Sequence, residues 1–233
     1  DPGLFLRALA DAVPGGFPRP EWVARLRERD AAREAEILSA PEGERGALDP
    51  VSLCRSLEET LPDDGVVVAD GGDFVATASY VLRPRAPLSW LDPGVFGTLG
   101  VGAGFALGAA LCRPGAPVLL LWGDGSAGYG FVEIDTFVRH GLGVVAVIGN
   151  DAAWTQIARE QVEVLGDDVG TVLRTTDYHA AARGLGGEGL LLDDPARRRP
   201  VLAEAFRLAR AGRPVVVDAR LGKTAFRKGS ISI

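Results

Sequence analysis

Residues 118–154 read VLLLWGDGSAGYGFVEIDTFVRHGLGVVAVIGNDAAW, and this stretch decides the fold. It contains two continuous apolar runs, residues 117–122 and 143–148, of the kind found in strands buried on both faces of a parallel sheet. Between them, residues 131–140 have the spacing of an amphipathic helix, and Gly123–Gly125 predicts a sharp turn after the first strand. A strand, a helix and a strand in this order predict the βαβ unit of a parallel sheet.

Polar side chains follow both strands of this unit. Asp124 closes the first strand, and Asn150 and Asp151 close the second. Because the carboxyl ends of parallel strands open onto one edge of the sheet, we expect these side chains in one crevice. Their oxygens suit Mg²⁺, which keeps part of its coordination shell for phosphates, and the nearby glycines leave N–H groups free to face a phosphate. A strand end closed by turn-forming Asp and Asn is the alternative.

The same alternation of strands and helices continues on both sides of the unit. Asp49-Pro50 predicts the start of a helix over residues 51–61, and the strand that follows, residues 65–69, delivers Asp70-Gly71-Gly72 to the same edge. The fold class is therefore α/β, a doubly wound parallel sheet with helices on both faces, preceded by a helical arm. The remaining predicted elements are helices over residues 74–81, 154–165, 178–185 and 195–211 and strands over residues 88–91, 189–192 and 214–218.

Residues 94–111, GVFGTLGVGAGFALGAAL, predict a helix that is unusually rich in glycine and alanine. Each glycine weakens an isolated helix by roughly 1 kcal/mol relative to alanine. This cost favours a close approach of the backbone to a cofactor or to a partner subunit. A tightly packed core helix is the alternative.

The amino-terminal part, residues 1–46, is predicted to be a short helix followed by a charged linker helix. Residues 4–13 have amphipathic helical spacing, and residues 21–38 are a mixed-charge helical pattern. The polar segment Pro41–Gly46 predicts the boundary, so that residues 47–233 form the main domain. The chain has no methionine, which suggests a piece of a longer protein.

Composition excludes several classes of function. The net charge of −6 argues against an extended nucleic-acid surface, and two cysteines are too few for a disulfide framework. No apolar run reaches the roughly 18 residues of a membrane helix. The GDGSAG turn lacks the lysine of a P-loop, and the chain has no nucleophile elbow.

Several motifs resemble one family. Gly-Asp-Gly at 123–125, followed two dozen residues later by Asn150-Asp151, resembles the motif of thiamine-diphosphate-dependent enzymes. Gly97-Thr98-Leu99-Gly100 resembles the GTMG stretch of acetolactate synthases and 2-hydroxyacyl-CoA lyases. The phrases FVRHGLGVVAVIGNDAAWTQIAREQ, TDYHAAARGLG and FRKGSISI are similar to the acetolactate synthase-like lyases of animals. The resemblance covers most of the chain and implies that residues 47–233 are the carboxyl-terminal, cofactor-binding domain of such an enzyme. It also implies that residues 1–46 are the end of a middle domain plus the charged linker helix.

The resemblance implies that thiamine diphosphate and Mg²⁺ bind here. Aligned without gaps, Asp151 takes the place of the second residue of the family's Asn pair, the usual side-chain ligand, and Asn150 becomes the ligand only if the loop shifts by one residue. Asp124 and the carbonyl of Ala153 complete the predicted metal ligands, and Leu99 takes the position beneath the bent cofactor. The predicted cofactor-binding residues are Gly71, Gly72, Asp73, Gly97, Thr98, Leu99, Gly123, Asp124, Gly125, Ser126, Asn150, Asp151, Ala153 and Trp154.

The resemblance also implies an activity, a lyase that cleaves 2-hydroxyacyl-CoA to formyl-CoA and a shortened fatty aldehyde. An acetolactate synthase-type carboligase and a non-catalytic cofactor-binding subunit are the alternatives. In the family the activating glutamate comes from the amino-terminal domain of a partner subunit, and no match to it exists here. We therefore expect no catalytic residue in this chain, which should bind the diphosphate end of the cofactor yet be inactive alone.

Further expectations concern partners and isolated residues. The resemblance implies a homodimer or tetramer, and localisation at the endoplasmic reticulum membrane through a segment outside this chain. His140 and His179 are expected to have structural roles. Lys223, Arg227 and Lys228 could meet a coenzyme A phosphate, but a solvated tail is the expectation.

Overall fold

The computed structural model describes residues 1–13, 15–16, 18–39, 47–224 and 226–227. Contacts between Cα atoms divide the chain into two compact units, residues 1–40 and residues 41–233. The predicted boundary segment, Pro41–Gly46, lies outside the described residues.

The first unit consists of helices α1 (Pro2–Ala12) and α2 (Pro20–Ser39). The Asp1 carboxylate caps α1 by accepting the N–H groups of Gly3 and Leu4, and a proline opens each helix, where its missing N–H costs nothing. Both helices lie where the amphipathic and charged patterns predict them. In the described ranges, no helix combines the length and the apolar character needed to cross a bilayer.

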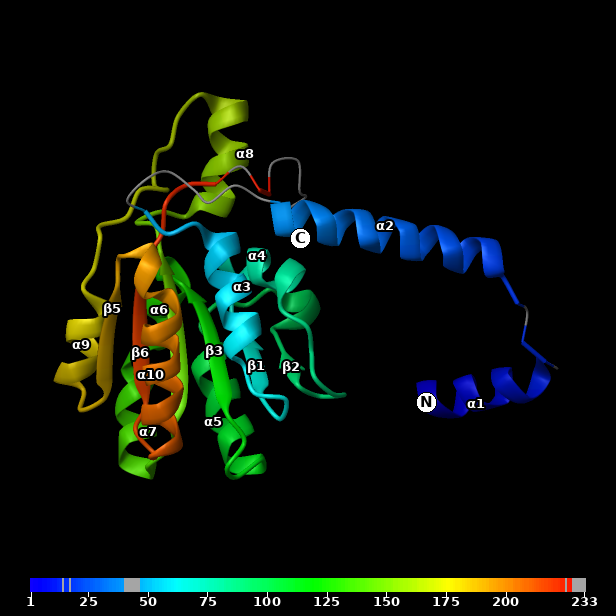
Figure 1. Cartoon of the computed structure of the whole chain (residues 1–233), viewed down its shortest axis with the longest axis horizontal. Coiled ribbons are helices and arrows are strands. Elements are labelled where there is room, and N and C mark those ends of the chain that lie inside the picture. The colour runs from blue at the N-terminus through cyan, green and yellow to red at the C-terminus, as the bar shows by residue number, and fades with distance from the viewer. Residues whose placement is uncertain (14, 17, 40–46, 225, 228–233) are drawn as a thin grey trace. The chain divides into compact units, whose positions relative to one another are not determined.

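The second unit is built on six parallel strands in the order β2-β1-β3-β4-β6-β5 (Figure 1). Every residue of β1, β3 and β4 is buried, as continuous apolar runs require in a sheet covered on both faces. β3 and β4 pair in register from Val118 with Val144 to Gly123 with Gly149, so they end at the same edge. The strands are β1 (Val66–Ala69), β2 (Trp90–Leu91), β3 (Val118–Gly123), β4 (Val144–Asn150), β5 (Glu188–Leu192) and β6 (Val215–Arg220).

Helices cover both faces of this sheet, which confirms the predicted doubly wound fold (Figure 1). Helices α5, α6, α7 and α9 share one core with alternate strand residues such as Leu120, Trp122 and Ile148. Helices α3, α4 and α10 pack together on the other face, and α8 lies above the carboxyl edge of the strands. Their bounds are α3 (Pro50–Thr60), α4 (Asp73–Val81), α5 (Gly102–Cys112), α6 (Asp124–Gly130), α7 (Ile134–His140), α8 (Thr155–Leu165), α9 (Tyr178–Gly184) and α10 (Arg198–Arg210), with short 3₁₀ turns at Gly94–Phe96, Phe131–Glu133 and Pro195–Arg197.

The predicted turn at Gly123–Gly125 is wrong, because β3 runs directly into a helix. Gly123 is still extended, with φ −73° and ψ 159°, and α6 begins at the next residue. The Ser126 hydroxyl donates to the Gly123 carbonyl at 3.1 Å, which joins the strand end to the first helical turn. The single helix predicted over residues 131–140 is instead a 3₁₀ turn followed by α7.

The predicted glycine-rich helix is also shorter than its sequence pattern. α5 begins only at Gly102, because the buried Asp70 carboxylate accepts the N–H groups of Gly100 at 2.9 Å and Gly102 at 2.6 Å. Gly97 and Gly100 have φ values of +57° and +88°, which glycine adopts without a steric cost. Residues 97–101 therefore form a loop that Asp70 holds against the end of β1.

Candidate cofactor and metal site

Two cavities open at the edge where β1, β3 and β4 end. The smaller has a volume of about 30 Å³, and the larger, of about 930 Å³, adjoins it at Gly72 and Trp154. Thr98 and Asn150, both within the described part of the chain, line neither cavity. Of the predicted residues, the smaller cavity is lined by Gly72, Asp73, Gly123, Asp124, Gly125, Ser126, Asp151, Ala153 and Trp154, and the larger by Gly71, Gly72, Gly97, Leu99 and Trp154.

Asp124 has the geometry of a metal ligand. Its Oδ1 accepts the N–H of Gly125 at 2.8 Å. The backbone N–H groups of Gly125, Ala152 and Ala153 act to lower the pKa of Asp124, but burial and the charge of Asp151 outweigh them and raise it. The Oδ2 of Asp124 is buried and has no hydrogen-bond partner among the described residues. A buried carboxylate oxygen without a partner is costly, and a hard cation would neutralise it. The donor set at this position therefore fits a divalent ion with oxygen ligands.

Asp151 supplies the second carboxylate of the smaller cavity. Its Oδ2 accepts the Thr155 hydroxyl at 2.5 Å, and burial, followed by the charge of Asp73, raises its pKa. Burial is the largest cause of the raised pKa of Asp124, and the negative charge of Asp151 is the second. Two acids that disfavour each other's ionisation are stabilised together by one cation between them.

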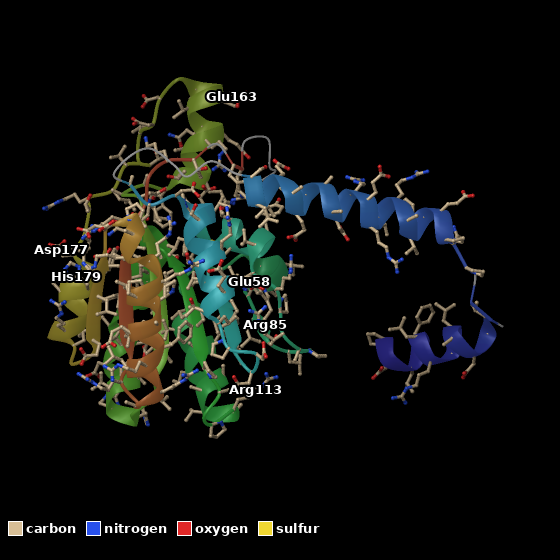
Figure 2. The ribbon with its side chains drawn as sticks, in the orientation of Figure 1. Glu58, Arg85, Arg113, Glu163, Asp177 and His179 are labelled. Atoms are coloured by element: carbon tan, nitrogen blue, oxygen red, sulfur yellow. The ribbon has the colours of Figure 1, made fainter. Side chains whose placement is uncertain are left out.

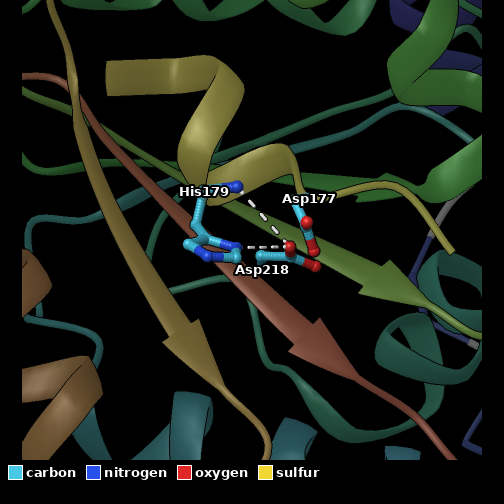
Figure 3. A group of neighbouring side chains, drawn as sticks. All are labelled: Asp177, His179 and Asp218. Carbon is cyan, nitrogen blue, oxygen red and sulfur yellow. Dashed lines mark hydrogen bonds and ion pairs between the residues drawn. The ribbon is translucent and has the colours of Figure 1, made fainter. Parts of the chain in front are cut away.

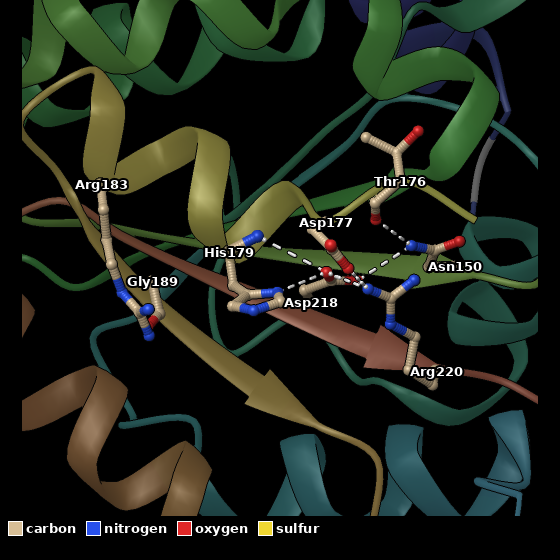
Figure 4. Close-up of polar contacts among 8 residues, drawn as sticks. All are labelled: Asn150, Thr176, Asp177, His179, Arg183, Gly189, Asp218 and Arg220. Atoms are coloured by element: carbon tan, nitrogen blue, oxygen red, sulfur yellow. Dashed lines mark hydrogen bonds and ion pairs between the residues drawn. The ribbon is translucent and has the colours of Figure 1, made fainter. Parts of the chain in front are cut away.

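Asn150 makes different contacts, although it precedes Asp151 directly. Its amide nitrogen donates to the Thr176 carbonyl at 2.9 Å and to Asp218 Oδ1 at 3.0 Å (Figure 4). These two bonds hold the side chain against β6 and against the segment that precedes α9. The Asn150 amide oxygen is buried and, among the described residues, has no hydrogen-bond partner, but of these two residues only Asp151 lines the smaller cavity with Asp124.

Aromatic and aliphatic side chains explain why glycines line this edge. A Cβ on Gly125 would lie 2.5 Å from the indole ring of Trp154, and a Cβ on Gly71 would overlap Leu99. Trp154 and Leu99 thus pack directly on backbone at the ends of β3 and β1. These glycines are required by close approach, since neither has a positive φ.

Two alanine substitutions in α6 should have opposite effects on stability. Gly125→Ala should lower the free energy of unfolding by about 1–3 kcal/mol, because the new Cβ meets Trp154. Gly128→Ala in the same helix meets nothing within 4 Å and should raise it by up to about 1 kcal/mol. Urea unfolding of the two variants checks this, and an equal effect of both would contradict the packing of Trp154.

The titration of Asp124 should make the stability of the metal-free chain depend on pH. Burial and the charge of Asp151 raise its pKa from 3.8 to about 6, so between these values the folded chain holds a proton that the unfolded chain releases. The free energy of unfolding should therefore fall, by on the order of 1–2 kcal/mol, as the pH rises from about 4 to about 6. The free energy of unfolding of Asp124→Asn should lack this pH dependence, because asparagine does not titrate. Above pH 6 in EDTA, the variant should therefore have a larger free energy of unfolding than the parent chain. A difference between the two chains that is constant with pH would contradict this.

A buried polar network ties the site to α9. Asp218 on β6 is fully buried, and its Oδ2 lies 2.9 Å from His179 Nδ1 and 3.0 Å from Arg220 Nη2 (Figures 3 and 4). Figure 2 places Asp177 and His179 at the amino end of α9. Asp177, His179 and Asp218 could by spacing hold a metal ion, but the Arg220 guanidinium already bonds both carboxylates. The arginine supplies the positive charge there, so the network has a structural role.

The sequence patterns missed several of these residues. Asp218 interrupts the apolar strand VVVDAR, a signal that could have marked a buried charge. The Tyr178 hydroxyl donates to the Asp124 carbonyl at 2.8 Å across 54 residues, and no spacing reveals such a pair. The expectation of a solvated tail is wrong for Arg227, which is 5% exposed and bonds Asp73. Lys228 lies outside the described residues.

The fold and the site together define a class of protein. A doubly wound parallel sheet with two cavities and buried acids at its carboxyl edge is an α/β domain of the class that binds ligands at that edge. Residues 70–219 match the family model of the thiamine pyrophosphate enzymes, C-terminal TPP binding domain. The chain belongs to this family, and its cofactor is thiamine diphosphate.

Individual relatives agree with this assignment. The chain is 51% identical over 238 residues to human 2-hydroxyacyl-CoA lyase 2, across 100% of this chain and 37% of the human protein. It is 39% identical over 215 residues to the acetolactate synthase large subunit IlvG of Mycobacterium tuberculosis, across 91% of this chain and 38% of that protein. A solved thiamine diphosphate-dependent 4-hydroxybenzoylformate decarboxylase of Rhodococcus jostii shares the fold, with a TM-score of 0.70 at 24% identity over 78% of this chain and 34% of that one. The chain thus spans 37% of the length of the human relative.

Proposed function

We propose that this chain is the cofactor-binding domain of a thiamine diphosphate-dependent carbon–carbon lyase that cleaves 2-hydroxyacyl-CoA to formyl-CoA and a shortened fatty aldehyde. The cofactor part is supported by one observation above all, the buried Oδ2 of Asp124, which has no hydrogen-bond partner in the described part of the chain and lies in the same cavity as Asp151. The substrate part is supported by the 51% identity to human 2-hydroxyacyl-CoA lyase 2.

Each residue of the edge has a role in this proposal. Mg²⁺ would be held by the carboxylates of Asp124 and Asp151 and by the carbonyl of Ala153. The backbone at Gly72 and Gly125 would face the phosphates, and the larger cavity, bordered by Leu99, would receive the ring system. When bound, the cofactor supplies a thiazolium that stabilises a carbanion beside a carbonyl. The chain itself binds, orients and shields the cofactor.

An acetolactate synthase-type carboligase is the second candidate, favoured by the 39% identity to a mycobacterial acetolactate synthase subunit. Product analysis of the full-length protein, supplied with 2-hydroxyacyl-CoA or with a 2-oxo acid, separates the two. A non-catalytic cofactor-binding subunit would give product from neither. Assembly into a homodimer or tetramer and attachment to the endoplasmic reticulum membrane stay predictions.

Calorimetric titration of thiamine diphosphate into the chain tests the proposal. We expect saturable binding in the presence of Mg²⁺ and its loss in EDTA, because the two acids repel the diphosphate without the cation. The isolated chain should bind without turning over substrate. Binding of equal strength with Mg²⁺ and with EDTA would contradict the proposed metal site.

A further inference from the structure

Three charged residues from distant segments meet at the edge of the site. Asp73 Oδ1 accepts Arg159 Nη2 at 2.6 Å and Arg227 Nη1 at 3.1 Å. Asp73 is the first residue of α4, Arg159 lies in α8, and Arg227 follows β6 near the carboxyl terminus. We call these three residues the Asp73 cluster.

The cluster carries more positive charge than its own carboxylate compensates. The side chains of Arg159 and Arg227 are 18% and 5% exposed, and that of Asp73 is 8% exposed. Two guanidinium groups thus share one carboxylate in a largely buried position. The Nε of Arg227 is buried and, within the described residues, has no hydrogen-bond partner. Buried guanidinium groups with unused N–H donors are costly until an anion accepts from them.

Asp73 and Arg227 lie where the two cavities adjoin, whereas Arg159 lines neither cavity and is connected to them through its ion pair with Asp73. Asp73 lines the smaller cavity with Asp124 and Asp151, and Arg227 lines the larger one with Leu99. A cofactor that places its phosphates at the acids and its rings in the larger cavity must pass this junction.

We propose that Arg159 and Arg227 are phosphate-binding residues for the diphosphate of the cofactor, and that Asp73 positions both guanidinium groups for this task. The inference rests on the proposed function and adds two arginines to the binding residues expected from the sequence. Planar guanidinium groups suit phosphate oxygens, which accept two parallel hydrogen bonds. The excess positive charge of the cluster would then complement the negative charge of the diphosphate.

Calorimetric titration with Mg²⁺ tests this with two probes, thiamine diphosphate and inorganic pyrophosphate, which lacks the rings. Arg227→Gln and Arg159→Gln should each weaken both probes by about 10- to 100-fold, the usual effect of a charged hydrogen bond. Arg227→Lys, which keeps the charge, should recover part of the loss and serves as the second variant if the glutamine variant does not fold. The control is Arg207→Gln, since Arg207 pairs with Glu204 on the surface of α10 and should leave both affinities unchanged.

The competing explanation is that the cluster only fastens α8 and residues 226–227 to α4. In that case the glutamine variants lower the melting temperature while both affinities stay at the parent value, and the inference is overturned. If the parent chain binds in a metal-dependent way and neither glutamine variant loses affinity, the inference is wrong while the proposed function still holds. If the parent chain binds neither probe with Mg²⁺, both fall.

Discussion

Asp124→Ala should weaken the Mg²⁺-dependent binding of thiamine diphosphate at least about 100-fold, since even the outer partners of a metal ligand are worth about 10- to 100-fold. Asp124 offers a buried oxygen that has no protein partner among the described residues, next to a second acid. Without it, the cation keeps only the carboxylate of Asp151 and backbone oxygen. The diphosphate then faces a site with too little positive charge.

Calorimetric titration measures this loss, and Asp135→Asn is the matched control. Asp135 is an exposed acid on α7 that pairs with Arg139, so its removal should leave the affinity unchanged. Alanine substitutions of Asn150 and of Asp151 distinguish which of these two predicted ligands holds the metal ion. Asp151→Ala should resemble Asp124→Ala, whereas Asn150→Ala should act mainly on stability. The reverse order of effects would show that Asn150, and not Asp151, holds the ion.

Asp218→Ala should lower the free energy of unfolding by about 3–5 kcal/mol, the cost of removing one partner of a buried charge pair. The Asp218 side chain is 0% exposed, and it accepts from Asn150, His179 and Arg220. Without the Asp218 carboxylate, the buried amide of Asn150 has only the Thr176 carbonyl as an acceptor. Arg220 then keeps only its ion pair with Asp177. The loop after β4, which carries Asp151, should also lose order.

Asp177→Ala is the matched control, because Asp177 bonds the same arginine from a position that is 72% exposed. Exposed ion pairs contribute little, so this variant should change the free energy of unfolding by less than about 1 kcal/mol. Urea unfolding of both variants measures the difference. Similar losses for the two would mean that Arg220, rather than buried Asp218, organises the network.

The sequence by itself determined the parallel sheet and the edge at which the site lies. Continuous apolar runs identify buried strands, and the residues just after such strands must meet at one edge, so Asp124, Asp151 and Gly72 could be placed together from local pattern alone. The family motif, which is also local, added the cofactor. Even there the pattern could not show that β3 passes directly into α6, since a glycine-rich segment is compatible with a turn or with the first turn of a helix.

Only the tertiary structure decided which neighbours these residues have. Asn150 donates a hydrogen bond to Asp218, which lies 68 residues later in the sequence. Asp70 accepts N–H groups 30 and 32 residues away, so that α5 begins only at Gly102. Arg227 bonds Asp73, from which it is separated by 154 residues. No spacing rule encodes such pairs, because each depends on how strands and helices are ordered in space. Burial makes these contacts important for stability, because a charge that water would solvate in an isolated segment needs a partner inside the fold.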